Sequence, residues 1–186
     1  MYFHDVILLL ASLSAPQTRN KIVAVSGQSI RRKEDIRFIT GKGRYTDDVC
    51  LPDQCHAIFA RSPIAHANIT SIDTTVAAAM PGVQLVLTGA DYDESGLGTL
   101  VCGWMIHSKD GSEMKPGLHP PLALGKVRHV GDPVAVVIAD SRQMARDAAE
   151  MIDVEYEDLA AVVSLKNAAG HESSVHNEVP GNVAFD

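Results

Sequence analysis

Residues 129–158, HVGDPVAVVIADSRQMARDAAEMIDVEYED, contain the strongest structural pattern in the sequence. A Gly-Asp-Pro turn leads into VAVVIA (134–139), an apolar run that is typical of a central strand buried on both faces. An unpaired charge in its middle, as in Val136→Asp, is therefore expected to prevent folding. A helical pattern follows, and DVEYED (153–158) alternates apolar and acidic residues as a half-buried strand does. The segment predicts a turn, a strand, a helix and a second strand.

The helix in this segment is predicted to pack closely on the sheet. Met144, Ala148 and Ile152 lie four residues apart on one face. Asp140 and Gln143 have the spacing of a capping box, in which side chains satisfy free backbone groups at the helix N-terminus. Because packing explains each of these residues, the segment is interpreted as scaffold.

Residues 67–91, ANITSIDTTVAAAMPGVQLVLTGAD, predict a second strand–helix–strand unit. Asp73 or Thr74 can cap its helix by accepting a backbone N–H, and Pro81-Gly82 ends the helix. The expected buried stripe of this helix consists of Val76, Ala77 and Met80.

Two other segments carry weaker signals. CHAIFARS (55–62) alternates in a way that predicts a half-buried strand. Residues 92–125 are rich in glycine and are expected to form a long loop, with LVCGWMI (100–106) as its one candidate strand. A loop of this length usually carries a function or contacts a partner.

Charge and cysteine content restrict the class of protein. A net charge of −7 disfavours nucleic acid or an anionic membrane as the main partner, because both attract basic surfaces. Three cysteines in 186 residues favour free thiols in a reducing compartment, so a cytoplasmic protein is expected. The apolar run VILLLASLSA (6–15) lacks the basic segment that precedes a signal-peptide core. Residues 1–26 are therefore expected to be a poorly ordered extension.

Two turns are candidates for phosphate binding. A phosphate loop opens directly onto a helix N-terminus. The turn at 131–133 opens onto a strand and carries an acid, and no apolar helix follows Gly41-Lys42-Gly43. A plain turn is the preferred interpretation of both.

Metal-binding and nucleophilic patterns are equally weak. Tetrahedral zinc favours tighter ligand pairs with a matching second pair, and iron–sulfur clusters usually take four thiolates. No G-x-S-x-G nucleophile motif is present. The sequence assigns no catalytic, cofactor-binding or metal-ligating residue. A surface histidine or a buried cysteine is the preferred interpretation of each candidate ligand: His171 with His176, Cys50 with Cys55 and His56, and Cys102.

EMKP (113–116) is similar to the Met-Lys sequence of biotin carriers, whose lysine sits at the tip of a hairpin. The alternative hypothesis is therefore an independent binding or carrier module of barrel-sandwich type, without catalysis, modified at Lys115.

Four longer motifs resemble one known family when they are taken in order. The resemblance covers residues 27–186 and is to the N-terminal region of the large, molybdopterin-binding subunit of the xanthine dehydrogenase/aldehyde oxidase family, with aerobic carbon monoxide dehydrogenase as the nearest type. The motifs are SIRRKEDIRFITGKGRYTDD (29–48), ARSPIAHANITSIDTTVAAAMPGVQLVLTGAD (60–91), LALGKVRHVGDPVAVVIAD (122–140) and ARDAAEMIDVEYEDLAAVV (145–163).

This resemblance implies an α+β fold, the α/β hammerhead, with a mixed β-sheet and short packed helices. The hammerhead domain is expected over residues 27–165, and 166–186 as a linker toward molybdopterin-binding domains. In the family, the cofactor motifs and the catalytic glutamate lie downstream of this region. The resemblance therefore implies a structural and subunit-interface role, without catalytic, cofactor-binding or metal residues in this chain.

The resemblance also implies the chemistry of the whole enzyme. A molybdenum hydroxylase is expected, with molybdenum–molybdopterin (cytosine dinucleotide) in downstream domains, and [2Fe–2S] clusters and FAD on other domains or subunits. The expected partners are those domains and subunits, with a second copy of the chain as a further candidate; no nucleic acid or membrane is expected. RSPIAH (61–66) and residues 92–125 are the candidate contact faces. The substrate is left open among carbon monoxide, an aldehyde and an N-heterocycle.

Overall fold

The computed structural model describes residue 27 and residues 30–186, so the expectation for residues 1–26 lies outside the described part. The described chain divides into two units, one that ends at Cys50 and one of residues 51–186. In the first unit, α2 (Asp35–Ile39) is followed by the 3-10 helix η1 (Thr46–Asp48). The rings of Phe38 and Tyr45 stack with their centroids 4.9 Å apart.

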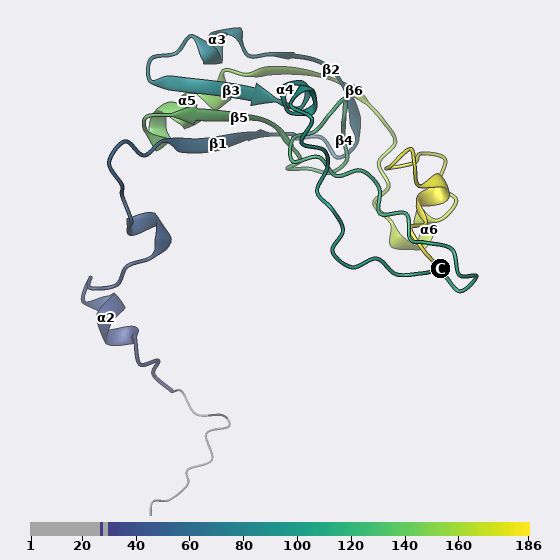
Figure 1. The fold of residues 1–186 in the computed structure, drawn as a ribbon, viewed down its shortest axis with the longest axis horizontal. Coiled ribbons are helices and arrows are strands. Elements are labelled where there is room, and N and C mark those ends of the chain that lie inside the picture. Colours follow the sequence, from purple (N-terminus) through teal and green to yellow (C-terminus); the bar gives the residue numbers. More distant parts are fainter. Residues whose placement is uncertain (1–26, 28–29) are drawn as a thin grey trace, which may run out of the picture. The chain divides into compact units, whose positions relative to one another are not determined.

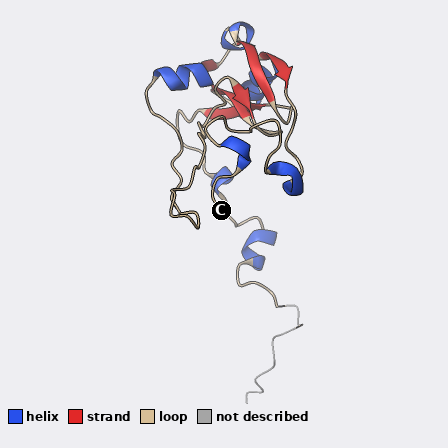
Figure 2. Ribbon diagram, turned by 90° about the vertical axis from the view of Figure 1, so that its right-hand side faces the viewer, coloured by secondary structure: helices blue, strands red, loops and turns tan. Residues whose placement is uncertain are grey.

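The second unit contains most of the secondary structure (Figure 1). Figure 2 shows its strands gathered together, with short helices and long loops around them. In chain order the elements are β1 (His56–Arg61), β2 (Ala67–Asp73), α3 (Thr75–Ala78), β3 (Val83–Thr88), α4 (Gly89–Glu94), β4 (Lys126–Val127), β5 (Pro133–Ala139), α5 (Arg142–Glu150), β6 (Asp153–Asp158), α6 (Leu165–Ala168) and the 3-10 helix η2 (Pro180–Asn182).

The strands form two three-stranded sheets, with the orders β1-β5-β3 and β4-β2-β6. Both strand–helix–strand predictions are confirmed, as is the strand expected over 55–62. Each strand–helix–strand segment, however, passes from one sheet to the other: β2 leads through α3 to β3, and β5 leads through α5 to β6. All described strand pairs are antiparallel, which refines the expected mixed sheet within an α+β fold.

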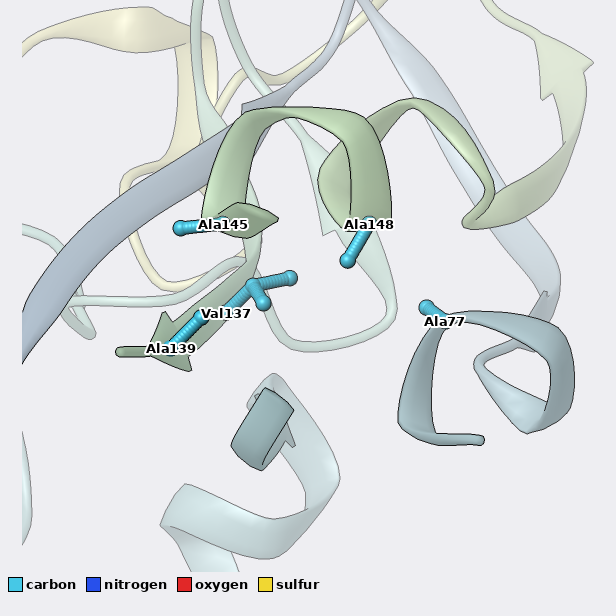
Figure 3. Close-up of a cluster of buried hydrophobic side chains, with 5 residues drawn as sticks. All are labelled: Ala77, Val137, Ala139, Ala145 and Ala148. Atoms are coloured by element: carbon cyan, nitrogen blue, oxygen red, sulfur yellow. The ribbon is translucent and has the colours of Figure 1, made fainter. Parts of the chain in front are cut away.

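Small side chains hold α3 and α5 against the β1-β5-β3 sheet. Val137 and Ala139 of β5 are fully buried beneath Ala145 and Ala148 of α5, and Ala77 of α3 joins them (Figure 3). Alanines at these helix positions let the backbone approach the sheet closely, as protein interiors require. A second cluster lies between the two sheets, because it joins Val134 of β5 to Ala67 of β2, Val127 of β4 and the loop residue Ala123.

The predicted start of α5 is wrong by one residue. Ser141 has extended dihedral angles and is the N-cap, and its Oγ accepts a hydrogen bond of 3.2 Å from the N–H of Met144. The carboxylate of Asp140 instead accepts a 2.7 Å hydrogen bond from Gln84. The packed face then consists of Ala145 and Ala148, while Met144 is 41% exposed. Met144 lies at the edge over Gly82, where a Cβ would stand 2.5 Å from its Sδ.

The expectations for α3 are correct in part. Asp73 Oδ1 accepts a 2.9 Å hydrogen bond from the N–H of Thr75, whereas the Thr74 side chain makes no capping bond. Ala77 is buried and Met80 partly buried, but Val76 is 51% exposed. A helix of four residues has too narrow a contact with the sheet to bury the whole predicted stripe.

The strand predicted at 100–106 is wrong. Residues 97–106 contain no strand, because a strand needs a partner ladder and only isolated contacts occur here. His107 and Glu113 form a single antiparallel bridge. In the described part of the chain, helices are too short or too polar to cross a membrane.

Candidate interaction surface

The RSPIAH loop after β1 interlocks with the Gly-Asp-Pro turn before β5. The N–H of Ser62 donates to the carbonyl oxygen of Asp132 at 2.9 Å, and the N–H of Gly131 donates to the carbonyl oxygen of Ser62 at 2.8 Å. The guanidinium of Arg61 also donates to the Gly131 carbonyl oxygen at 2.8 Å. The two motifs therefore satisfy each other's backbone groups.

The carboxylate of Asp132 is used inside its own turn. Asp132 is 7% exposed, and its Oδ2 accepts a hydrogen bond of 2.9 Å from the N–H of Arg128. Burial raises the pKa of the neighbouring Tyr156. A side-chain hydrogen bond with Ser62 lowers that pKa in part, and the negative charge of Asp132 raises it further. These contacts agree with a plain turn, because a buried acid repels the anion that a phosphate loop binds.

His66, the last residue of the loop, points inward. Its Nδ1 lies 2.8 Å from the carbonyl oxygen of Ala160 and 3.3 Å from Ser173 Oγ, so it joins the segment after β6 to the C-terminal segment. His66 is 3% exposed and Ser62 is 2% exposed. The hypothesis that 61–66 forms a contact face is therefore wrong for these two residues, since their side chains hold loops together.

Gly41-Lys42-Gly43 ends a helix and does not begin one. The N–H groups of Gly41 and Lys42 donate to the carbonyl oxygens of Phe38 and Arg37, at 3.0 and 2.9 Å. A Cβ on Gly43 would overlap the Phe38 ring. This geometry also agrees with a plain turn.

The other candidate ligands have separate structural environments. Cys50, Cys55 and Cys102 are exposed free thiols. His171 Nδ1 accepts a 3.1 Å hydrogen bond from the N–H of Ser173. Across residue 27 and residues 30–186, no three His, Cys, Asp or Glu side chains are placed to hold a metal ion together.

His176 lies in a more polar place, in a cavity of about 120 Å³ that includes Arg128 and His119. Burial lowers the pKa of His176, and the positive charge of Arg128 lowers it further, while Glu178 opposes the change. The sequence favours a surface histidine over a metal ligand at His176 and does not reveal this environment, which depends on residues far away in the chain.

Lys115 is not at a hairpin tip. The turn of the hairpin lies at 109–111, where the N–H of Gly111 donates to the carbonyl oxygen of Ser108. Lys115 follows the bridge residue Glu113, and its N–H donates to the carbonyl oxygen of Ala184 at 2.9 Å. The geometry of a biotin-type carrier is therefore absent at this residue.

One face of the β1-β5-β3 sheet is apolar and stays partly exposed within the unit of residues 51–186; it is called here the uncovered face, although Val134 at one end of it is buried. Side chains alternate along β5, so Val136 and Ile138 lie on the face opposite Val137. The pairing aligns them with partners from β1 and β3, and Phe59 and Leu85 are 44% and 45% exposed. The two cross-sheet rows are Ala57–Ile138–Leu85 and Phe59–Val136–Leu87.

Sequence reasoning missed this uncovered face, although its signal was present. The strand at 134–139 is apolar on both faces, while the nearby helices are too few and short to cover both. A cleft of about 540 Å³ lies between the edge strands β1 and β6 and helix α5. Its wall joins apolar residues such as Ile58 and Ile152 to the charged Arg146 and Glu150.

Comparison with known protein families gives one match over most of the second unit. Residues 40–160 match the model of the aldehyde oxidase and xanthine dehydrogenase a/b hammerhead domain. The chain belongs to this family. The resemblance seen in the sequence motifs is thereby confirmed.

The most informative relatives are large subunits of oxidoreductases. The nicotine 6-hydroxylase large subunit of Paenarthrobacter nicotinovorans is 40% identical over 172 residues, which is 92% of this chain and 20% of the relative. The carbon monoxide dehydrogenase large chain of Afipia carboxidovorans is 39% identical over 80% of this chain and 17% of its own length. The chain thus spans about a fifth of the length of these relatives.

Solved structures give the same result for this hammerhead domain. Quinoline 2-oxidoreductase from Pseudomonas putida 86 superposes with a TM-score of 0.63 at 43% identity, over 80% of this chain and 18% of the other. Aldehyde oxidoreductase from Desulfovibrio gigas gives 0.65 at 33% identity, over 83% and 17%. The hammerhead fold is therefore shared with enzymes of several different names.

Proposed function

We propose that this hammerhead domain braces the large subunit of a molybdenum hydroxylase and forms interfaces inside that enzyme. The observation that carries the proposal is the uncovered apolar face of the β1-β5-β3 sheet. Burial of apolar surface contributes roughly 25 cal/mol per Å², so such a face gains stability when another domain covers it. The buried polar residues of the RSPIAH loop and the Gly-Asp-Pro turn serve the fold in this proposal.

The chemistry of the proposed enzyme belongs to groups outside this domain. Relatives include a xanthine dehydrogenase molybdenum-binding subunit of Escherichia coli and a Cu,Mo-containing carbon monoxide dehydrogenase. In this proposal the groups that react with substrate lie in the molybdopterin-binding domains, and the side chains of this domain support them. A molybdopterin-bound molybdenum supplies substrate oxidation in the proposed enzyme, with the cofactor in its cytosine dinucleotide form.

The proposed partners follow from the same relatives. Their names describe large subunits, a large chain and a subunit gamma, which implies assembly with other polypeptides in those proteins. For this chain we propose contacts with the molybdopterin-binding domains and with subunits that carry [2Fe–2S] clusters and FAD. A second copy is a further candidate partner, and the proposed compartment is the cytoplasm.

Metal analysis tests whether the molybdenum binds outside residues 1–186. Residues 1–186 purified alone should contain no stoichiometric molybdenum, whereas the longer large subunit that contains this sequence should contain it. Stoichiometric molybdenum in the short chain, or its absence from the longer one, would contradict the proposal.

Self-association tests the uncovered face. Residues 1–186 alone should associate at high protein concentration, because the apolar face has no cover. A substitution of Phe59 by serine should reduce the association, and the same substitution at the exposed Leu165 of α6 should not. A monomer at all concentrations, measured by sedimentation, would argue against a large contact face.

A further inference from the structure

The segment of residues 97–118, called here the arm, presents large apolar side chains to solvent. Trp104 is 80% exposed and Val101 is 88% exposed. No charged residue occurs between Glu94 and Lys109, so no formal charge in this half of the arm opposes its burial against another protein surface. The arm's large exposed apolar residues are Leu97, Leu100, Val101, Trp104, Met105 and Leu118.

The arm has a defined shape, because its two halves are hydrogen-bonded to each other. The N–H of Leu100 donates to the carbonyl oxygen of His119 at 3.0 Å, and the N–H of His119 donates to Thr99 Oγ1 at 2.7 Å. Further out, the N–H of Met114 donates to the carbonyl oxygen of Ile106 at 3.0 Å. Trp104 therefore sits on a fixed backbone between two points of attachment, which lowers the entropy lost when it binds.

The C-terminal residues of the chain attach directly to this arm. The N–H of Lys109 donates to the carbonyl oxygen of Asp186 at 2.7 Å, and the two side chains form an ion pair at 3.2 Å. The N–H of Asp186 lies 3.3 Å from Ser108 Oγ. Figure 1 shows the C-terminus beside the loop that follows α4. Any residues that follow Asp186 therefore start beside the arm.

We propose that the arm docks onto an apolar surface of the domain that follows Asp186 in the same polypeptide, with Trp104 as its anchor. This inference rests on the proposed function, in which the chain is part of a longer large subunit. A following domain tethered at Asp186 has a high effective concentration at the arm. Buried tryptophan is among the side chains that contribute most at protein interfaces, and an uncharged centre is typical of a lasting contact.

A natural cysteine reports on the docking. Cys102 is exposed and lies two residues from Trp104, and the exposed Cys55 lies outside the arm, directly before β1. Both thiols are labelled with a maleimide in residues 1–186 and in the full-length large subunit that contains this sequence. Peptide mass spectrometry gives the rate at each cysteine, and each rate is divided by that of the same peptide in urea.

Docking predicts that Cys102 reacts roughly tenfold or more slowly in the full-length subunit than in residues 1–186. Cys55 shows whether protection is confined to the arm. An equal rate for Cys102 in the two proteins would overturn the inference. Molybdenum content is measured on the same full-length sample: molybdenum present with Cys102 reactive refutes only the docking, and molybdenum absent refutes the proposed function.

Variants identify the anchor. Trp104→Ser should restore fast labelling of Cys102 in the full-length subunit, and Trp104→Phe should keep it slow because an aromatic anchor remains. Leu165→Ser, at a residue that is 94% exposed on α6, is the matched control and should change nothing. In residues 1–186 alone, Trp104→Ser should leave the melting temperature unchanged. Continued protection of Cys102 in full-length Trp104→Ser would exclude Trp104 as the anchor.

Discussion

The N–H of Gly131 donates a 2.8 Å hydrogen bond to the carbonyl oxygen of Ser62. In return, the N–H of Ser62 donates to the carbonyl oxygen of Asp132, the residue after Gly131. This reciprocal pair joins the end of β1 to the start of β5, strands that lie side by side in one sheet. A turn before a strand–helix–strand unit resembles a ligand-binding loop, but here its polar groups are already bonded to protein. The motif stabilises the sheet from which the apolar face is built.

Asp132→Ala should destabilise the chain by about 1–3 kcal/mol, because the partly buried N–H of Arg128 loses its acceptor. Asp132→Asn is the matched control, since its amide oxygen can still accept that hydrogen bond. Urea unfolding followed by circular dichroism gives both values. Equal stability of the alanine variant and the wild type would mean that this hydrogen bond is not required.

Val137→Asp should abolish cooperative folding, because residue 137 is fully buried and an isolated buried carboxylate costs several kcal/mol. The sequence alone favoured Val136 for this test, and the structure corrects the choice, because Val136 faces the uncovered side of the sheet. Val136→Asp should cost the isolated chain less than Val137→Asp, because residue 136 is only partly buried and its carboxylate keeps some contact with water. Thermal melting of both variants measures the contrast. A cooperative melt of Val137→Asp would show that β5 is misplaced.

Gly89→Ala should destabilise the chain by roughly 1–3 kcal/mol, because the new Cβ overlaps the carbonyl oxygen of Ala123 and lies 2.8 Å from its carbon. Both contacts are with backbone, which cannot move aside as a flexible side chain can. Gly103→Ala, where no atom lies within 4 Å of the added Cβ, is the control. Denaturant midpoints of the two variants should differ clearly. Similar midpoints would contradict the close approach of α4 to residue 123.

His176 should make the stability of the chain sensitive to mild acid. Burial and the charge of Arg128 hold the pKa of His176 below 6.5, its ordinary value, although Glu178 opposes this. Below pH 6.5 the folded state thus binds fewer protons at His176 than the unfolded state does. The stability that comes from a neutral His176 is therefore complete above pH 6.5 and is lost as pH falls through the lowered pKa. His176→Gln should therefore reduce the fall in melting temperature between neutral and mildly acidic pH. His129→Gln, at an exposed residue of the same cavity, should not.

Local pattern was sufficient for much of this domain. The alternation in 153–158 placed Val154 and Tyr156 inward, and the apolar run at 134–139 gave the central strand. The same reasoning failed where the outcome depended on contact partners. Residues 100–106 have strand-like composition but no neighbouring strand, and Val76 is apolar on a helix too short to cover it.

The sequence by itself determined the elements, the family and the scaffold character of the central unit, because hydrophobic period and turn chemistry act over a few residues. Only the tertiary structure decided which strands share a sheet, which side chains are sealed and which apolar face stays open. Those outcomes depend on pairing between residues far apart in the chain. The partners of β5, at 56–61 and 83–88, are fixed by the pairing of whole strands, and the local sequence of β5 does not specify them.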